Sequence, residues 1–475
     1  MAEIKTVCWI QHASEWKFFI PIARALKSYG VESIFVCKSL HAHKQYQDAG
    51  FKSYTVVDLF KDTERISEDF LAKLDKTYGP PGIHAIGDSD VQMVAYFSNK
   101  RDKKYQLIGK AYKFWEKFLS EHKVQALMAP DSATFITRTA HNIARERGLP
   151  FAQILIGPSD WHFTVDDVDE SHVWSRFLKE IEKGFQPLTD DQLKITRDFV
   201  ARRTNQAVEG LPLRFVPPSL FTSIRQYLGM WWYDRPKERQ DNPVHVATLR
   251  YGRKRLLKKM IWKYITQVFF KYDLPKDDDK FIYFPIFSGE EASYIVNDLY
   301  FVRNEVSLIK EIAESLPMGH LLYVKEHPFN PGDLTYWQLK ELKKVSNIRV
   351  LHPSISSHEL IDASAGVFVL QGTTGWESFL IKKPVISMSN PYFSYSSLVY
   401  TVDRPSDLEA VIRRMLENGN SIYKDNEDEW MWFIHAVIST CGQGRTLRSQ
   451  PPFGYVEDEE NATKIARYLI DNLIP

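Results

Sequence analysis

The sequence predicts an α/β protein with two domains, each built around a parallel, doubly wound sheet. Three observations lead to this prediction. The chain has 475 residues, which is too many for one ordinary domain. In both halves, short apolar runs alternate with segments of helical period, as strands and helices do in parallel sheets. Between the halves, residues 160–275 are helical, aromatic and charged, and they interrupt the alternation.

The first half opens with a strand, a turn, a helix and a second strand. Residues 6–10 form an apolar run, and residues 18–29 have a helical period that stops at Gly30, the residue type most common just after a helix. Further strands are expected at 33–37, 124–128 and 151–156. We assign residues 1–275 to an N-terminal domain, with a helical insertion at about 160–275.

The second half resumes the alternation after a charged linker, residues 273–280. Apolar runs predict strands at 281–284, 321–324, 347–350, 367–370 and 385–388. Ser356 and Glu359 have the spacing of a capping box, which predicts a helix start. We assign residues 276–455 to a C-terminal domain, and we expect residues 456–475 to form a helix that packs back on the N-terminal domain.

Composition excludes several classes of protein. Lys plus Arg number 61 and Asp plus Glu number 60, so no global charge favours nucleic acid as a partner. Cys8, Cys37 and Cys441 lack metal-ligand spacing and are typical of a reducing compartment. The N-terminus does not read as a signal peptide, and no apolar window approaches the length of a membrane span. We therefore expect a cytoplasmic protein.

Polar turns follow two strands of the second half. They contain Lys325, Glu326, His327 and Pro328 after one strand, and Gln371, Gly372, Thr373 and Thr374 after the other. In parallel sheets this edge binds ligands. A phosphate group requires backbone N–H donors, a helix N-terminus and one or two cations, all of which these turns supply. The two turns together predict a phosphate site, with the threonines capping the helix that follows. Each turn alone is more typical of an ordinary connection.

Glu377 lies in the first turn of the helix that follows Gly372. In nucleotide-binding α/β domains an acidic residue pairs with the ribose diol, and Glu377 is a candidate for that role. The alternative is an interaction with the helix dipole.

The second half also resembles a known family, over residues 280–400. The matching segments are Phe284-Pro285, Glu290-Glu291-Ala292-Ser293, Leu316-Pro317-Met318-Gly319, the run from Tyr323 to Pro328, and the run from Gln371 to Glu377. In these segments the sequence resembles the bacterial capsule and surface-polysaccharide biosynthesis glycosyltransferases, which include Kdo transferases. One departure is Ser288-Gly289-Glu290-Glu291, where the family has His or Gln before Pro-Glu-Ala-Ser.

This resemblance implies a GT-B fold, in which two Rossmann-type domains face a cleft. It implies a nucleotide-sugar donor in the C-terminal half and a glycan or lipid-linked glycan acceptor at the N-terminal half. The His-Pro turn paired with a Thr-rich turn is similar to that of sialyltransferases that use CMP-sugars. The resemblance therefore favours CMP-Kdo or a similar donor.

Glycosyl transfer also requires a base or a nucleophile, usually a carboxylate or histidine at a strand end. Asp131 is the leading candidate because it ends a strand at the functional edge, and His12, Glu291, Asp88 and Asp160 are alternatives. Each of these residues could instead serve as a turn or helix cap. No Asp-x-Asp motif suggests a metal-dependent sugar-nucleotide site, so we predict a metal-independent enzyme without a cofactor.

The segment Arg250–Lys263 is basic and interleaved with apolar residues. It predicts an amphipathic helix that could lie on an anionic membrane, where a lipid-linked acceptor would be found. This would make the protein peripheral on the inner face of the cytoplasmic membrane. The alternative is a solvated helix packed on the N-terminal domain.

Three other functions remain open. A sugar-nucleotide epimerase of the UDP-N-acetylglucosamine 2-epimerase type uses a similar two-domain fold. Glycerophosphate transfer in wall-polymer synthesis uses related Lys-x-His-Pro turns. A non-catalytic nucleotide-glycan binding protein would keep the phosphate site but tolerate substitution of Asp131. The long insertion with its basic helix favours a large or membrane-borne acceptor, and therefore transfer.

Overall fold

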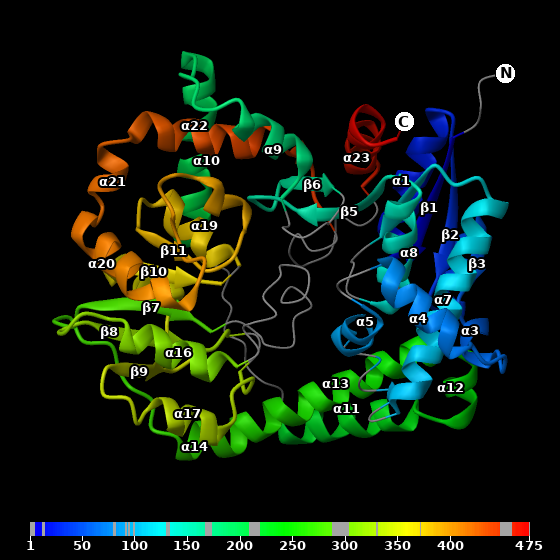
Figure 1. Ribbon diagram of the computed structural model, residues 1–475, viewed down its shortest axis with the longest axis horizontal. Coiled ribbons are helices and arrows are strands. Elements are labelled where there is room, and N and C mark those ends of the chain that lie inside the picture. Colours follow the sequence, from blue (N-terminus) through cyan, green and yellow to red (C-terminus); the bar gives the residue numbers. More distant parts are fainter. Residues whose placement is uncertain are drawn as a thin grey trace. The chain divides into compact units, whose positions relative to one another are not determined.

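The computed structural model of this chain describes residues 5–11, 15–78, 82–90, 93, 96–97, 100–129, 134–166, 173–208, 219–286, 304–328, 331–370, 372–446 and 458–474. The chain divides into two compact units (Figure 1). Unit 1 contains Met1–Asp169, Arg225–Lys254 and Thr440–Pro475, and unit 2 contains Glu170–Ile224 and Arg255–Ser439. Residues 160–275, expected as one insertion of the N-terminal domain, are thus shared between both units.

Unit 1 contains a seven-stranded sheet within its described residues. The order is β13-β6-β5-β4-β1-β2-β3. The strands are β1 (Lys5–Gln11), β2 (Val31–Cys37), β3 (Lys52–Thr55), β4 (Ala126–Ala129), β5 (Phe151–Ile156), β6 (His162–Asp166) and β13 (Gly442–Gln443). The first five are parallel; β1, β2, β4 and β5 are the strands that the sequence predicts, and β3 is not among them. The last two are antiparallel additions that the sequence did not predict.

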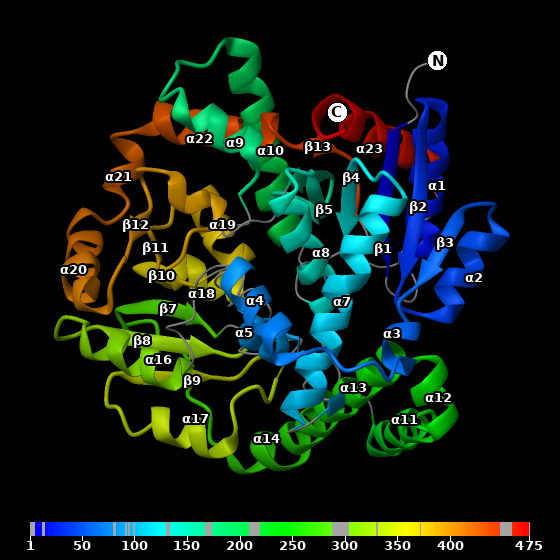
Figure 2. The same ribbon diagram turned by 45° about the vertical axis from the view of Figure 1, so that its right-hand side comes forward.

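Helices cover both faces of the unit 1 sheet. The described helices of unit 1 are α1 (Trp16–Ser28), α2 (Leu40–Asp48), α3 (Asp58–Lys61), α4 (Glu68–Tyr78), α5 (Ile83–Ser89), α7 (Arg101–Glu121), α8 (Phe135–Glu146), α12 (Pro236–Asp241) and α23 (Glu459–Asn472). Side chains alternate along β1, so Trp9 joins α1 and α23 in one core while Ile10 joins α7 and α8 in the other. Both views place α23 beside α1 (Figure 1, Figure 2).

Unit 2 contains a parallel sheet with the order β12-β11-β10-β7-β8-β9. Its strands are β7 (Phe281–Pro285), β8 (Leu321–Lys325), β9 (Ile348–Leu351), β10 (Gly366–Val369), β11 (Val385–Ser387) and β12 (Tyr400–Thr401). Counted from β7, the order from the far edge is 3-2-1-4-5-6, the order of a doubly wound dinucleotide-binding sheet. The predicted fold class, two Rossmann-like α/β domains, is therefore confirmed.

Helices also surround the sheet of unit 2. The helices are α9 (Ser175–Glu182), α10 (Asp190–Val208), α14 (Gln267–Phe269), α16 (Glu305–Glu314), α17 (Tyr336–Leu342), α18 (Ser357–Ala363), α19 (Thr373–Leu380), α20 (Leu408–Asn418), α21 (Ser421–Lys424) and α22 (Glu427–Ser439). Ser356 caps α18 by accepting a hydrogen bond from the backbone N–H of Glu359, as its sequence predicts. Figure 1 shows α10 lying against α22 and α19.

Two further helices, α11 (Leu220–Trp232) and α13 (Pro243–Ile261), run through the points where the chain passes between units. Among the helices described here, none is both long and apolar enough to cross a bilayer.

Candidate functional site

The candidate site lies at the switch point of the unit 2 sheet. Strand β7 pairs with β8 on one side and with β10 on the other, so the helices that follow these strands diverge at β7. Ligands of doubly wound sheets bind outside the carboxyl ends of the strands at such a point. Helix α19 begins here, directly after β10.

The two polar turns do not follow adjacent strands of the unit 2 sheet. Strand β7 lies between β8 and β10, because the connection after β9 crosses to the other side of β7. The two strand ends are therefore separated by two strand spacings, about 10 Å. A lysine side chain is long enough to bridge much of that gap.

Two glycines at the start of α19, Gly372 and Gly375, are each required for a different structural reason. Gly372 has φ +97°, a conformation that strains any other residue, and it occupies the N-cap position of α19. Thr373 and Thr374 are thus the first helical residues and not the caps that we expected. At Gly375 an added Cβ would lie 2.4 Å from the Phe393 ring, so only glycine lets α19 pack this closely.

Lys325 is the central cation of the site. It ends β8, and only 2% of its surface is exposed. Its Nζ has no hydrogen-bond or ion-pair partner within the described part of the chain. Burial lowers the pKa of Lys325 to about 8, because the charged form has lost its water. A buried lysine without a counter-charge is costly, and a bound anion would remove that cost.

Two histidines lie close enough to Lys325 to feel its charge. His327 is exposed at the surface, but the atoms packed around its ring lower its pKa and Lys325 lowers it further. Burial and Lys325 likewise lower the pKa of His352. His352 accepts a hydrogen bond from the backbone N–H of Ser354, so it is a turn residue. Both imidazoles are neutral at pH 7 and can donate or accept a hydrogen bond.

Glu326 has a structural role in the structure, although the sequence placed it among the donor-binding residues. Its Oε1 accepts hydrogen bonds from the backbone N–H groups of Gly332 (3.1 Å) and Leu334 (3.0 Å). Burial, assisted by Asp333, raises the pKa of Glu326 to about 7 against the opposing effect of these backbone donors. The side chain therefore closes the loop that follows Pro328, a half-buried turn residue.

Glu377 is held by a residue that sequence reasoning missed. It is the fifth residue of α19, beyond the first turn where we expected it, so a helix-dipole role is weaker. Its Oε1 accepts a hydrogen bond of 3.0 Å from Arg203 of α10. The Nε of Arg203 is buried without a hydrogen-bond partner among the residues described here. No local pattern in the sequence marks Arg203, because it lies in the predicted insertion.

The three leading catalytic candidates, His12, Asp131 and Glu291, lie outside the described residues, as does Gln371. The strands that precede His12 and Asp131, β1 and β4, are neighbours at the switch point of the unit 1 sheet. Of the alternatives, Asp160 is half-buried in the turn between β5 and β6, and the side chain of Asp88 is not among those described.

Around that switch point, unit 1 buries several polar groups that sequence reasoning also missed. Lys38, which follows β2, is almost fully buried and donates a 2.5 Å hydrogen bond to Oγ1 of Thr134. Tyr46 donates a 2.7 Å hydrogen bond to Gln11 at the end of β1. Nothing in the sequence around Lys38 indicates that this lysine is buried. In the described parts of both units, no cluster of three or more His, Cys, Asp or Glu could hold a metal ion.

Comparison with known protein families assigns part of unit 2. Residues 302–413 match the family described as capsule polysaccharide biosynthesis protein. This match covers about a quarter of the chain. The capsule-biosynthesis segment contains Lys325, His327, Gly372 and Glu377, and the family resemblance inferred from sequence is confirmed there. No curated protein matches the chain.

Solved structures offer weaker likenesses. The Thermosulfurimonas dismutans KpsC, a β-Kdo 2,7 transferase, is 12% identical, covers 76% of this chain and 89% of its own, and has a TM-score of 0.38. A glycosyltransferase from Rickettsia africae is 11% identical over 99% and 100% of the two chains, with a TM-score of 0.32. The Methanocaldococcus jannaschii UDP-GlcNAc 2-epimerase is 12% identical over 98% and 100%, with a TM-score of 0.30. These values assign neither substrate nor reaction to the present chain.

Proposed function

We propose that this protein is a glycosyltransferase of capsule or surface-polysaccharide synthesis that binds the phosphate of a nucleotide-sugar donor in unit 2. The observation that carries the proposal is the buried side chain of Lys325, which has no charge partner among the residues that the structure describes, at the switch point of a dinucleotide-type sheet. The capsule-biosynthesis family match over the same residues supports it. An anionic ligand explains why the fold tolerates a desolvated cation in this place.

The donor phosphate would lie between Lys325 and the N-terminus of α19. The first N–H groups of a helix have no partner within the helix and attract anions. His327 would add a hydrogen bond, and the guanidinium of Arg203 would add positive charge beside Glu377. Together these groups would stabilise the charge that develops on the leaving nucleotide. We therefore propose that transfer does not require a metal ion.

The donor we favour is CMP-Kdo or a similar CMP-sugar, because the His327-Pro328 turn and the Thr-rich turn are similar to those of CMP-sugar sialyltransferases. The acceptor would be a growing surface polysaccharide or a glycolipid bound by unit 1. Asp131, His12 or Glu291 would act on its hydroxyl group. The protein would work in the cytoplasm on the inner face of the membrane.

Thermal unfolding in the presence of CMP, CDP, UDP, GDP and their sugars tests the donor site. A ligand that binds only the native state raises the midpoint by mass action. We expect CMP compounds to raise it, Lys325→Met to abolish the shift, and Lys344→Met to retain it, because Lys344 is exposed outside the site. A failure of every nucleotide to shift the midpoint would overturn the proposal.

Transfer itself requires a second measurement. Radiolabelled donor and an acceptor glycan should give a labelled product in the presence of a chelator. Asp131→Asn should abolish the product yet leave the CMP-induced thermal shift intact. A UDP-selective shift with sugar interconversion but no acceptor would instead identify an epimerase.

A further inference from the structure

Helix α11 presents its apolar face to solvent. Leu220, Phe221, Ile224, Leu228, Trp231 and Trp232 are each 43–78% exposed. At about 100° per residue, these six side chains fall within an arc of roughly 120°. Ser223, which lies outside this arc, is buried. Most amphipathic helices pack their apolar stripe on a core, whereas α11 directs its apolar stripe to solvent.

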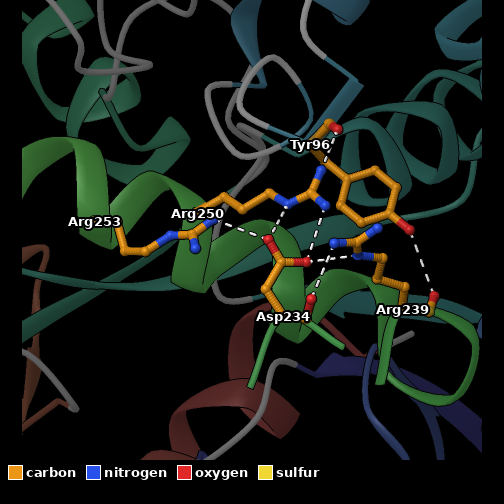
Figure 3. A network of polar contacts seen from close by, with 5 residues as sticks. All are labelled: Tyr96, Asp234, Arg239, Arg250 and Arg253. Atoms are coloured by element: carbon orange, nitrogen blue, oxygen red, sulfur yellow. Dashed lines mark hydrogen bonds and ion pairs between the residues drawn. The ribbon is translucent and has the colours of Figure 1, made fainter. Parts of the chain in front are cut away.

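The orientation of this stripe is fixed by a charge cluster just after the helix. The two oxygens of Asp234 accept hydrogen bonds from Arg239, Arg250 and Arg253 at 2.7–2.9 Å (Figure 3). Arg250 also donates to the backbone carbonyl of Tyr96 at 2.7 Å. Burial disfavours ionisation of Asp234, but these hydrogen bonds outweigh it and lower its pKa to about 2. The ion pairs persist at any physiological pH.

Packing on the inward side agrees with this orientation. The sulfur of Met230, on the inward face of α11, lies 3.3 Å from where a Cβ of Gly252 in α13 would be. An added Cβ at position 252 would therefore crowd the Met230 side chain, so α11 and α13 pack closely at this point. Turning α11 to bury its apolar stripe would break both this contact and the Asp234 cluster, so the outward stripe is a stable feature of the fold.

Charge identifies what would cover the stripe. Between residues 219 and 263 the sequence has eleven Lys or Arg and three Asp or Glu, in a chain whose net charge is +1. A second copy of the chain docked on this face would bring two cationic surfaces together, which costs energy. An anionic surface gains energy instead.

Aromatic residues point to a lipid surface in particular. Trp231, Trp232 and Tyr233 follow one another at the end of α11. The guanidinium carbon of Arg235 lies 3.5 Å from the ring centroid of Trp232. Trp and Tyr beside basic residues are typical of side chains at the boundary between lipid headgroups and acyl chains. Helix α11 has 13 residues, too few to span a bilayer but enough to lie in its interface.

We propose that α11 docks the protein on an anionic lipid bilayer, with its apolar stripe inserted at the headgroup level and nearby basic residues on the lipid phosphates. The sequence alone placed such contact on residues 250–263. In the structure Arg250 and Arg253 instead hold Asp234, and so position α11. This proposal does not depend on the donor or the reaction proposed above.

Flotation with vesicles tests the proposal. The wild-type chain should float with vesicles of phosphatidylcholine and phosphatidylglycerol, and much less with phosphatidylcholine alone. The triple variant Phe221→Ser, Leu228→Ser and Trp231→Ser should lose at least about tenfold in vesicle affinity, because three inserted side chains are removed. Trp337→Ser is the matched control, since Trp337 is 73% exposed on a different helix, α17, and it should float normally.

Two further measurements distinguish loss of membrane binding from loss of folding. The triple variant should keep the wild-type circular dichroism and thermal midpoint, since it alters only exposed residues. Should it fail to fold, brominated lipids should still quench wild-type tryptophan fluorescence more than that of Trp231→Ser. Equal flotation of the triple variant would overturn the proposal. So would self-association of the wild type in sedimentation, lost in the triple variant, without vesicle binding.

Discussion

The side chain of Arg203 donates a 3.0 Å hydrogen bond to Glu377 across 174 positions of sequence. Arg203 lies on α10 and Glu377 on α19, so the pair joins a helix of the predicted insertion to the helix that starts at the switch point. The side chains expose only 18% and 17% of their surface. The pair therefore positions α19 and places a guanidinium about one turn from its N-terminus.

Removal of either partner should destabilise unit 2, because the other charge stays half-buried without compensation. We expect Arg203→Met and Glu377→Gln each to cost about 1–3 kcal/mol of unfolding free energy in urea titrations. The double variant should be less destabilised than the sum of the two, with a coupling energy of about 1 kcal/mol or more. Strict additivity would show that the hydrogen bond contributes nothing.

Arg203 also illustrates what the sequence could not predict. Strands β7 to β11 of unit 2 were predictable because each is a local apolar run, whereas the two-residue strand β12 was not predicted. The turn residues Lys325 and Gly372 follow directly from the strand ends. The order of the strands, with β7 between β8 and β10, depends on where long connections cross, which no local period records. The partner of Glu377 and the antiparallel strands β6 and β13 likewise depend on contacts between distant segments.

The outward face of α11 could not be predicted for a related reason. Hydrophobic periodicity identifies an apolar stripe, but it does not say which way the helix turns. That direction is set by Asp234 and its arginines, which are charged residues in an ordinary-looking basic segment.

Lys325 makes a prediction about pH. Its folded-state pKa of about 8 lies below the usual value of a lysine, and an anion bound to Nζ would raise it. Above pH 8, binding must therefore take up a proton, and affinity for CMP should fall by up to about tenfold per pH unit. The phosphate of CMP and the neutral His327 do not titrate between pH 7.5 and 9.5, so calorimetric titration over this range isolates Lys325.

Lys325→Met is the matching variant. Its CMP affinity should be at least about tenfold weaker and independent of pH in this range, since one charge-assisted hydrogen bond is lost. The unliganded variant should unfold at a higher temperature than the wild type, because a desolvated charge has been replaced by an apolar chain of similar length. A variant that is less stable and binds CMP normally would remove Lys325 from the site.

The pKa of Glu326 is shifted upward, and this shift predicts how stability depends on pH. Its pKa rises from 4.5 to about 7 on folding, so the folded state binds the proton more tightly than the unfolded state. Its contribution to stability is therefore fully present below pH 4.5 and is lost as pH rises to about 7, by up to about 3 kcal/mol. In Glu326→Gln the amide oxygen still accepts from Gly332 and Leu334, but this pH dependence is absent.

Thermal unfolding of the wild type and of Glu326→Gln between pH 5 and 8 measures the difference in stability that Glu326 causes. The two should be similar at pH 5, and Glu326→Gln should be the more stable at pH 8. Parallel stability curves would mean that Glu326 does not titrate in this range.

The two glycines Gly375 and Gly229 allow a matched test of packing at α19. A Cβ at Gly375 would lie 2.4 Å from the Phe393 ring and 3.0 Å from Cγ2 of Val369, both in the core of unit 2. Gly375→Ala should therefore cost about 1–3 kcal/mol, because the overpacked helix must shift away from the sheet. Gly229 also lies within a helix, but its Cβ would meet nothing within 4 Å, so Gly229→Ala should stabilise by about 0.5–1 kcal/mol. The same pair of variants tests the ligand site. If Gly375→Ala displaces α19, its N-terminal amides move, so this variant should show a smaller CMP-induced rise of the thermal midpoint, whereas Gly229→Ala should show the wild-type rise. If Gly375→Ala is as stable as Gly229→Ala, close packing is not what this position requires.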